Sequence, residues 1–271
     1  MNKKFNKLIT YLKEAGKQGI CLAFSGGIDS SLLLYLCIKA DSTLKRKITA
    51  ITFKSVFQTQ EEINYTVEFC KKYGIKHKII EFFPLKDKTL IYNPKDRCYF
   101  CKKLMFSKLI NFCEENNIKH IFDGTNNDDV NLYRPGLKAL KELNIISPFV
   151  KFEINKKEIR QYAKISGLKN YNKPSTPCLA TRFPYNEELC EEKILMIKKG
   201  EDILKEYDLK EIRLRLHNNI LRIEINKNKF NKLLKVKDEI IKKLKNPKIK
   251  YITLDLEGIR SGSMDETIDA N

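Results

Sequence analysis

Long apolar runs are missing from this sequence, and their absence excludes a membrane-spanning helix. No stretch approaches the roughly 20 consecutive apolar residues that such a helix needs. The basic residues at the start are followed by neither an apolar segment nor a small-residue cleavage site, as a secretory signal would require. We therefore expect a cytoplasmic protein with no membrane partner. Hydrophobic residues still make up 42% of the chain, which is enough for a packed core and excludes wholesale disorder.

Acidic residues are too few to balance the basic ones. The 52 lysines and arginines outnumber the 34 aspartates and glutamates, which gives a formal net charge of +18. Such an excess suits the binding of a polyanion such as RNA, but it also arises when lysines cover solvated helix faces. Because acidic residues are interleaved throughout, we favour the second interpretation and expect no nucleic-acid partner. A small anionic substrate such as a nucleotide fits either one.

The first half of the chain alternates between short apolar runs and helically spaced apolar residues. The short runs predict strands, and the helical spacing predicts helices. The strands are expected at 19–24, 48–53, 78–82 and 120–123, and the helices at 2–16, 29–40, 60–73 and 98–116. This alternation predicts an α/β fold, with a parallel sheet and helices on both of its faces. Ligands of such sheets bind at the carboxyl ends of the strands.

The second half changes character after several proline-rich loops. Its pattern predicts a helix at 155–166, a long charged helix at 186–207, a β-hairpin around Asn218-Asn219, a lysine-rich helix at 227–245 and a last strand at 251–256. We therefore predict two domains. An α/β domain covers 1–185, and a smaller α+β domain over 186–271 serves substrate binding or oligomerisation.

The loop after the first strand runs from Ser25 to Ser30 and reads Ser-Gly-Gly-Ile-Asp-Ser. Its glycines permit a sharp turn and bring backbone N–H groups close to an anion, and the following helix adds the positive end of its dipole. The alternative is an ordinary tight turn with helix-capping residues, which the strand–loop–helix context disfavours. The loop has neither the Walker A lysine nor the Gly-x-Gly-x-x-Gly dinucleotide pattern.

This loop resembles the S-G-G-x-D-S motif of the PP-loop ATP pyrophosphatases, whose fold is Rossmann-like (the HUP class). The resemblance implies that Ser25, Gly26, Gly27, Asp29 and Ser30 hold the pyrophosphate of ATP while a substrate oxygen attacks the α-phosphorus. It implies Mg²⁺ as well, since the ion neutralises charge on the phosphates. Asp29 would fix either the loop or the ion.

Further groups are candidates for contacts with the nucleotide. Gly124 and Thr125 follow the fourth strand, at the edge where ligands bind, although a turn rich in Asn and Asp gives the same pattern. The Arg182 guanidinium suits a bidentate contact with a phosphate of ATP or AMP. Asp128 and Asp129 are either Mg²⁺ ligands or merely solvated acids.

Three arginines of the second domain suit the phosphate of a substrate. Arg213 and Arg215 alternate on one strand face, and Arg260 follows the last strand. The alternative is cross-strand pairing with acids such as Glu224.

Three of the eight cysteines have neighbours that favour chemistry. Cys98 and Cys101 lie one turn apart near a helix start, which suits a redox pair, half of a zinc site or two structural thiols. A four-cysteine zinc site would need a second close pair, and the sequence has none. Cys178 lies in a proline-rich loop, an unusual place for a core residue, although a structural thiol is the alternative.

Over nearly its whole length the chain resembles the LarE family, the ATP-dependent sulfur transferases that make the nickel-pincer nucleotide cofactor of lactate racemase. The matching strings are Ser25 to Ser30, Asp96 to Lys102, Asp123 to Asn126 with Asp128-Asp129, Tyr133 to Gly136, Lys173-Pro174, Cys178 to Ala180, Arg182 to Tyr185, Leu256 to Gly258 and Arg260 to Met264. The resemblance implies that a carboxylate of a pyridinium biscarboxylic acid mononucleotide is adenylylated, and that sulfur then displaces AMP to leave a thiocarboxylate. It also implies a homo-oligomer, a hexamer.

The resemblance implies one of two sulfur sources. In some members a cysteine at the position of Cys178 gives up its own sulfur and becomes dehydroalanine. Other members have two further cysteines, matching Cys98 and Cys101, and hold a 4Fe–4S cluster on all three, with one iron free to carry an extra sulfide. Because all three cysteines are present and thiolates are the normal cluster ligands, we favour the cluster. Sulfide or a sulfur-delivery protein would reload it.

Three other functions compete with this one. An amidotransferase-type synthetase would need an ammonia-producing partner or domain, and no glutaminase-like Cys–His pattern is apparent. A PP-loop tRNA thiolase would use the same loop and cysteines, with the net charge binding RNA, but no RNA-binding module is recognisable. A nucleotide-binding protein without catalysis would have no use for three candidate sulfur ligands. We expect instead an enzyme that forms AMP and pyrophosphate from ATP, with Cys178, Asp29 and Arg182 as catalytic residues.

Overall fold

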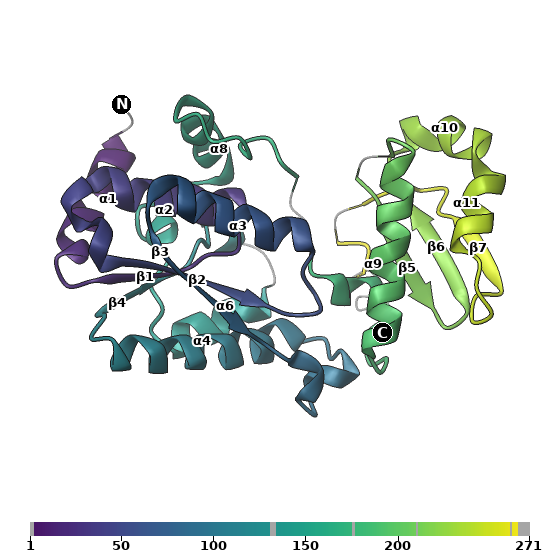
Figure 1. The fold of residues 1–271 in the computed structure, drawn as a ribbon, viewed down its shortest axis with the longest axis horizontal. Helices are drawn as coiled ribbons and strands as arrows, with labels where there is room; N and C mark the ends of the chain where they lie inside the picture. The colour runs from purple at the N-terminus through teal and green to yellow at the C-terminus, as the bar shows by residue number, and fades with distance from the viewer. Residues whose placement is uncertain (1–2, 131–133, 175–176, 210, 261, 265–271) are drawn as a thin grey trace. The chain divides into compact units, whose positions relative to one another are not determined.

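The chain divides into two units in the structure, a computed structural model (Figure 1). The larger unit comprises Met1–Pro84 and Asp96–Ser175, and the smaller unit comprises Leu85–Lys95 and Thr176–Asn271. The residues that the structure describes are 3–130, 134–174, 177–209, 211–260 and 262–264. The sequence placed the boundary after residue 185, whereas the smaller unit takes in residues from 176 onward and one separate earlier segment.

This earlier segment, 85–95, is held in the smaller unit by a buried asparagine. Asn93 is fully buried, and its Nδ2 donates to the carbonyl oxygen of Pro184 at 2.7 Å. A backbone bond of 2.7 Å from Leu189 to Ile91 adds to this connection. Because buried amide groups need partners, Asn93 ties the segment to the loop that follows Arg182.

A parallel sheet of four strands forms the centre of the larger unit. Its strands are β1 (Ile20–Ala23), β2 (Ile48–Lys54), β3 (Lys76–Glu81) and β4 (His120–Phe122), in the order β3-β2-β1-β4. β1 and β2 are almost wholly buried, as expected of strands covered on both faces. The chain runs outward from β1 to β3 and then returns to β4 on the other side of β1. At such a reversal the loops after the two strands diverge and leave a crevice at their carboxyl ends.

Helices cover both faces of this sheet, as the sequence predicted (Figure 1). One face carries α1 (Lys3–Gly16), α2 (Ile28–Ala40), α3 (Gln60–Tyr73) and α8 (Lys156–Ile165), and the other carries α4 (Arg97–Glu115) and α6 (Pro135–Glu142). Two short helices, α5 (Asn127–Val130) and α7 (Pro148–Lys151), lie between β4 and α8 in the chain. α2 is apolar all round because it is buried on nearly all sides, with Leu32, Leu33 and Leu36 fully buried. The predicted α/β class is confirmed.

The smaller unit is built on a three-stranded sheet. β5 (Arg213–His217) and β6 (Ile220–Glu224) are antiparallel, and β7 (Tyr251–Leu254) lies parallel to β6. The helices are α9 (Glu191–Glu206), α10 (Phe230–Lys235) and α11 (Lys237–Leu244). The hairpin is confirmed, and Asn218 takes the positive φ of 54° that its turn requires. The single helix predicted at 227–245 is wrong, since Val236 separates two helices, and α9 begins later than the predicted residue 186.

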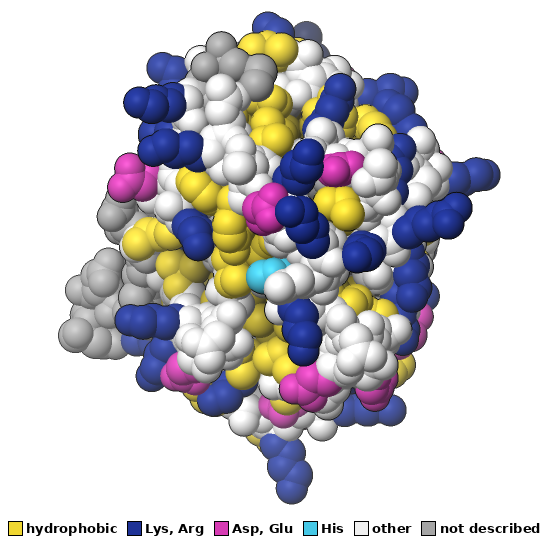
Figure 2. All heavy atoms as spheres, turned by 90° about the vertical axis from the view of Figure 1, so that its left-hand side faces the viewer, with side chains coloured by type: hydrophobic (Ala, Val, Ile, Leu, Met, Phe, Trp, Pro, Cys, Tyr) yellow, Lys and Arg dark blue, Asp and Glu magenta, His cyan; other side chains and the backbone are white. Residues whose placement is uncertain are grey.

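Basic side chains are spread over the face shown in Figure 2, with apolar and acidic side chains between them. Some lysines pair with acids of neighbouring elements, such as Lys248 with Glu192 at 2.6 Å and Lys243 with Glu206 at 2.8 Å. Exposed pairs of this kind contribute little to stability, because solvent screens them. No helix within the described ranges is long and apolar enough to cross a membrane.

Candidate active site

The loop between β1 and α2 is shaped for an anion. Gly26 has a φ of +76°, which glycine adopts without strain, and a Cβ there would lie 3.0 Å from Thr66. Gly27 is the N-cap of α2, so the first N–H groups of this helix have no partner in a preceding turn. The hydroxyl oxygens of Ser25 and Ser30 lie 3.2 Å apart. The predicted loop residues therefore meet at the positive end of the α2 dipole.

An asparagine far along the chain fixes this loop. Asn170 is buried, and its Nδ2 donates to the carbonyl oxygen of Gly26 at 3.2 Å and to the Ser31 hydroxyl at 3.0 Å. The Ser31 hydroxyl in turn donates to the same carbonyl at 3.4 Å. Sequence reasoning missed Asn170, because a lone asparagine in a loop gives no signal.

Gly124 lets the end of β4 approach the start of α2. A Cβ at this position would lie 2.8 Å from the Ser30 nitrogen and 3.0 Å from the Ser30 Cα. The next residue, Thr125, is buried, and its hydroxyl donates to Asp123 at 2.5 Å. Both residues predicted to contact the nucleotide after β4 thus lie beside the phosphate loop.

A cavity of about 300 Å³ opens at the carboxyl ends of the strands. Its polar lining residues include Ser25, Gly27, Asp29, Ser30, Lys102, Asp123, Thr125, Asp129 and Arg134, and its apolar ones include Ile51, Phe53, Ile63, Met105 and Phe106. Its size lies at the lower end of the range for small-molecule pockets. Polar groups at a helix start beside an apolar wall have the chemistry that a nucleotide requires, with phosphates on one side and a base on the other.

Asp29 lies in this cavity and is paired on one side only. Nζ of Lys156, at the start of α8, is 2.5 Å from Oδ2, while Oδ1 is buried without a hydrogen-bond partner among the described residues. Burial raises the pKa of Asp29 above its ordinary value; Lys156 opposes this rise and the nearby Asp129 adds to it. A buried carboxylate oxygen without a partner favours a cation or a proton.

Asp29 and Asp129 form a candidate Mg²⁺ site. Both line the cavity, and Asp129 is also paired with Arg134 at 3.0 Å. In the described part of the chain no three His, Cys, Asp or Glu side chains are grouped closely enough to hold a metal. Mg²⁺ needs no such group, because one or two carboxylates usually bind it together with substrate phosphates and water. Asp128, the other predicted acid, accepts from the backbone N–H of Lys156 at 3.0 Å and does not line the cavity.

Replacing Asp29 with asparagine is expected to lower the Mg²⁺ affinity of the ATP-loaded protein at least roughly tenfold, which is the loss caused by removing even an indirect metal contact. The amide keeps the shape of the carboxylate but not its charge. Because the folded-state pKa of Asp29 is raised, wild-type affinity should fall as the pH drops through that raised value, at a higher pH than for an ordinary aspartate. Mg²⁺ titrations with ATP at several pH values check both effects. Asp128→Asn is the matched control, and wild-type affinity in Asp29→Asn would exclude Asp29 as a ligand.

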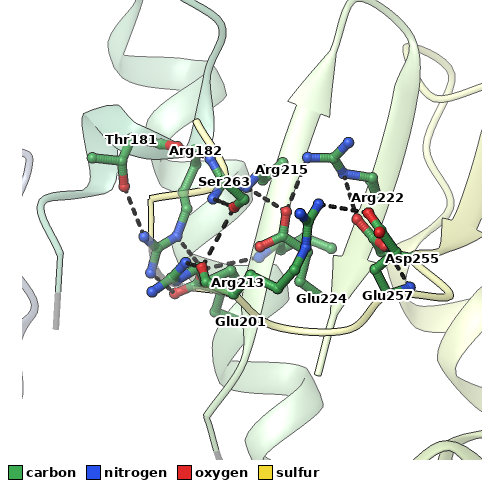
Figure 3. A network of polar contacts seen from close by, with 12 residues as sticks. Thr181, Arg182, Glu201, Arg213, Arg215, Arg222, Glu224, Asp255, Glu257 and Ser263 are labelled. Carbon is green, nitrogen blue, oxygen red and sulfur yellow. Dashed lines mark hydrogen bonds and ion pairs between the residues drawn. The ribbon is translucent and has the colours of Figure 1, made fainter. Parts of the chain in front are cut away.

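The smaller unit holds a network of arginines and acids (Figure 3). Arg182 ends the short 3-10 helix Leu179–Arg182 and is only 2% exposed. Its Nε donates to Glu201 at 2.6 Å, and its Nη1 donates to the Thr181 hydroxyl at 2.9 Å. Glu201 also accepts from the backbone N–H of Leu214 at 3.0 Å, which ties α9 to β5. Sequence reasoning missed Glu201.

Arg215 and Glu224 form a second buried pair in this network. Oε1 of the fully buried Glu224 accepts from Nε of Arg215 at 2.5 Å and from Nη2 of Arg222 at 2.9 Å. The other nitrogens of Arg215 donate to the carbonyl oxygen of Thr181 at 2.7 Å and to the Ser263 hydroxyl at 2.9 Å. The pairing with Glu224 that the sequence offered as the alternative is therefore present.

Arg213 and Arg260 also meet in the network. Nη1 of Arg213 donates to the carbonyl oxygen of Arg260 at 2.5 Å, and Arg260 is paired with Glu257 at 2.7 Å. Burial lowers the pKa of Arg213, and the neighbouring charges of Arg215 and Arg182 lower it further. The guanidinium groups thus repel one another, a cost that a bound anion would reduce.

The cysteines fall into buried and accessible sets. Cys21, Cys37, Cys70 and Cys113 are buried. Burial raises the pKa of Cys37 and of Cys70 to about 12, so both remain thiols near neutral pH.

The accessible set includes the three cysteines that the sequence selected. Cys98 and Cys178 are exposed and Cys101 is partly exposed. Cys98 and Cys101 lie at the start of α4 in the larger unit, and Cys178 precedes the 3-10 helix of the smaller unit. Of the residues behind the family resemblance, Tyr133 and Ser261 lie outside the described residues.

A glycine- and serine-rich loop at a helix start, at the switch point of a parallel sheet and without a Walker A lysine, marks an ATP-dependent enzyme of the PP-loop class. In agreement, residues 1–96 match the NAD synthase family. The pyridinium-3,5-bisthiocarboxylic acid mononucleotide synthase of Lactiplantibacillus plantarum is 32% identical over 261 residues, which cover 96% of this chain and 93% of the relative. The chain belongs to the family of that synthase, the LarE family of ATP-dependent sulfur transferases.

Uncharacterized proteins of two other organisms share this full-length similarity. One from Methanocaldococcus jannaschii is 38% identical over 260 residues, or 96% of this chain and 98% of its own. One from Synechocystis sp. is 32% identical over 249 residues, or 91% of this chain and 92% of its own. The predicted family and the predicted ATP dependence are confirmed.

Proposed function

We propose that this chain adenylylates a carboxylate of a pyridinium biscarboxylic acid mononucleotide and then exchanges the activated oxygen for sulfur, in the biosynthesis of a nickel-pincer nucleotide. The observation that carries the proposal is the cavity in which the phosphate loop, Asp29 and Gly124 meet at the switch point of the sheet. The name of the L. plantarum synthase supplies the class of acceptor.

In this proposal the larger unit carries out the first step. Ser25, Gly26, Gly27 and Ser30 bind the β,γ-pyrophosphate through hydroxyls and helix N–H groups, and Gly124 and Thr125 contact the nucleotide. A carboxylate oxygen of the substrate attacks the α-phosphorus, the bond from this phosphorus to the bridging oxygen breaks, and pyrophosphate leaves. Mg²⁺, when bound by Asp29 and the phosphates, neutralises charge on the leaving group. Sulfur then attacks the activated carbonyl carbon, and AMP departs with the former carboxylate oxygen.

The arginine network is proposed to bind the phosphate of the substrate. Arg213, Arg215 and Arg260 concentrate positive charge that is only partly neutralised, and guanidinium groups bind phosphate in bidentate fashion. Nη1 of Arg182 now donates to the Thr181 hydroxyl, and we propose that it donates to a phosphate of ATP or AMP instead when the nucleotide is bound. We infer that the smaller unit is the substrate-binding domain and takes part in a homo-oligomer, a hexamer.

The reaction itself provides the first test. Incubation with ATP, Mg²⁺, sulfide and the pyridinium biscarboxylic acid mononucleotide should yield AMP, pyrophosphate and an acceptor whose mass shows the exchange of oxygen for sulfur. AMP formation with tRNA as the only effective acceptor would instead identify a tRNA thiolase. No AMP with either acceptor would overturn the proposal.

We further propose that Cys98, Cys101 and Cys178 hold a 4Fe–4S cluster. Cys98 and Cys178 are exposed and Cys101 is partly exposed, and cysteine thiolates are the usual ligands of such clusters. When bound, the cluster would supply one iron with an open position for an extra sulfide, which sulfide or a sulfur-delivery protein would replace. Donation of the Cys178 sulfur itself is the alternative route within the same function.

Iron analysis distinguishes these routes. Protein purified without oxygen and reconstituted with iron and sulfide is expected to hold about four irons per chain, and Cys98→Ala, Cys101→Ala and Cys178→Ala should each lose most of them. Cys190→Ala is the matched control, because Cys190 is an exposed thiol outside this set. A wild-type protein without iron would contradict the cluster, and loss of sulfur from Cys178 after one turnover, seen by mass spectrometry, would then establish the sacrificial route.

A further inference from the structure

One lysine of α4 reaches the cavity, although the sequence assigned it no role in binding ATP. Lys102 lines the cavity, and its Nζ is 3.6 Å from Oδ2 of Asp123. It directly follows Cys101 and is four residues after Cys98, and residues three or four apart lie on one face of a helix. Cys98 therefore lies one turn before Lys102 along α4, although neither Cys98 nor Cys101 lines the cavity itself.

Asp123 holds this lysine in place and is itself fixed. It directly follows β4 and is almost completely buried. Ser147 donates its hydroxyl to Oδ1 at 2.5 Å, and Thr125 donates its hydroxyl to Oδ2 at 2.5 Å. With both oxygens accepting, the carboxylate has a single position, so it acts on Lys102 as a fixed counter-charge.

Gly136 fixes the stem of the lysine from the other side. A Cβ on Gly136 would lie 2.9 Å from Cδ and 3.3 Å from Cε of Lys102, so α6 packs directly against the side chain. The next residue points elsewhere, because Lys103 pairs with Tyr99 at 2.9 Å and with Glu142 at 3.1 Å. Two adjacent lysines of one helix thus have different surroundings.

We propose that Lys102 is a catalytic residue that binds the α-phosphate of ATP. The phosphate loop faces the cavity from α2, on one side of the sheet, and Lys102 faces it from α4, on the other side. The loop holds the β,γ-pyrophosphate, so the lysine on the opposite side contacts the adjacent α-phosphate. As the carboxylate oxygen bonds to the α-phosphorus and the bond to pyrophosphate breaks, the ammonium group neutralises charge on the non-bridging α-oxygens. This inference rests on the ATP site of the proposed function.

The position of Lys102 also determines where the adenylylated carboxylate forms. The α-phosphorus would lie against the turn of α4 that carries Cys98 and Cys101. The activated carbonyl carbon is one bridging oxygen away from that phosphorus, so it would form close to the helix turn that carries the two thiols. One helix turn therefore links the adenylylation step to the proposed sulfur carrier.

Binding of AMP and of Mg²⁺-pyrophosphate, each measured alone by calorimetry, tests the proposal. Lys102→Met is expected to weaken AMP binding roughly 10- to 100-fold, the range for losing a hydrogen bond to a charged group, and to leave pyrophosphate binding unchanged. Lys102→Arg should retain most of the AMP affinity. Lys103→Met is the matched control, since it removes an equal charge from the neighbouring residue, and should bind AMP as the wild type does.

Unchanged AMP affinity in Lys102→Met, or an equal loss of pyrophosphate affinity, would overturn the proposal. If Lys102→Met does not fold, Gly136→Ala decides the question, because it keeps the charge of Lys102 but displaces its side chain. This variant must also weaken AMP binding more than pyrophosphate binding. The titrations need neither acceptor nor sulfur source. A wild type that binds AMP through Lys102 but fails to thiolate the mononucleotide would therefore refute the proposed substrate alone. A wild type that binds neither ligand would refute the ATP site and this role together.

Discussion

Replacing Gly124 with alanine is expected to lower the rate of pyrophosphate formation roughly 100-fold, the cost of a misplacement of about 1 Å at a reacting centre. The new Cβ would lie 2.8 Å and 3.0 Å from backbone atoms of Ser30. Backbone atoms cannot rotate away as a side chain can, so the end of β4 and the start of α2 must separate. The N–H groups of the phosphate loop would then lose their common alignment on the pyrophosphate.

A second glycine provides the control for this experiment. Gly16 lies at the end of α1, away from the cavity, and a Cβ there would meet only the end of the Leu44 side chain, which can move. Gly16→Ala should therefore keep the wild-type rate. Thermal melting of both variants without ATP separates a damaged fold from a damaged site. A folded Gly124→Ala variant with a rate within about threefold of the wild type would show that the close approach of Gly124 to Ser30 is not needed.

Replacing Glu224 with glutamine is expected to lower the free energy of unfolding by about 3–5 kcal/mol, the cost of leaving a buried charge without its partner. Glu224 is fully buried, and one of its oxygens accepts from both Arg215 and Arg222. The amide has nearly the same volume, so the loss reports on charge rather than on packing. Urea unfolding of wild type and variant measures the difference.

An exposed acid of the same network serves as the matched control. Glu257 pairs with Arg260, and its side chain is 67% exposed. Glu257→Gln should change the free energy of unfolding by less than about 1 kcal/mol, because solvent screens such pairs. Equal effects from the two substitutions would mean that the burial of Glu224 does not determine its contribution. A small effect from Glu224→Gln would mean that the arginines find other partners.

Local patterns in the sequence were enough to predict most of the larger unit. The four strands and the long helices were placed within a few residues, because apolar period and length define them directly. The helix α6 was missed, since Pro135 and Gly136 suggested a loop. Proline is in fact favoured in the first turn of a helix, where its missing N–H has no partner to lose. The break at Val236 was missed because the lysine-rich helical pattern continues across it without a proline or glycine.

The sequence predicted only those residues of the candidate site that belong to a recognisable motif. The phosphate loop and the residues after β4 follow from strand–loop–helix context. Lys156 and Asn170 reach Asp29 and Gly26 from far along the chain, and only the tertiary fold brings them there. Glu201 could have been found, since it continues the buried stripe of α9 formed by Ile194, Ile197 and Leu204, where a lone acid indicates a buried partner.

The two edges of the parallel sheet differ in how open they are to pairing with strands of other protein molecules. Beyond β4, a parallel bridge between Phe122 and Ile146 covers the edge. At the other edge, β3 has only β2 beside it among the described strands. Lys76 and Lys78 of β3 are exposed along this edge. An uncovered edge invites strands of other chains to add to it, and lysines oppose this because each added copy would bring like charges together. Part of the lysine excess therefore keeps the enzyme from aggregating edge to edge at high concentration.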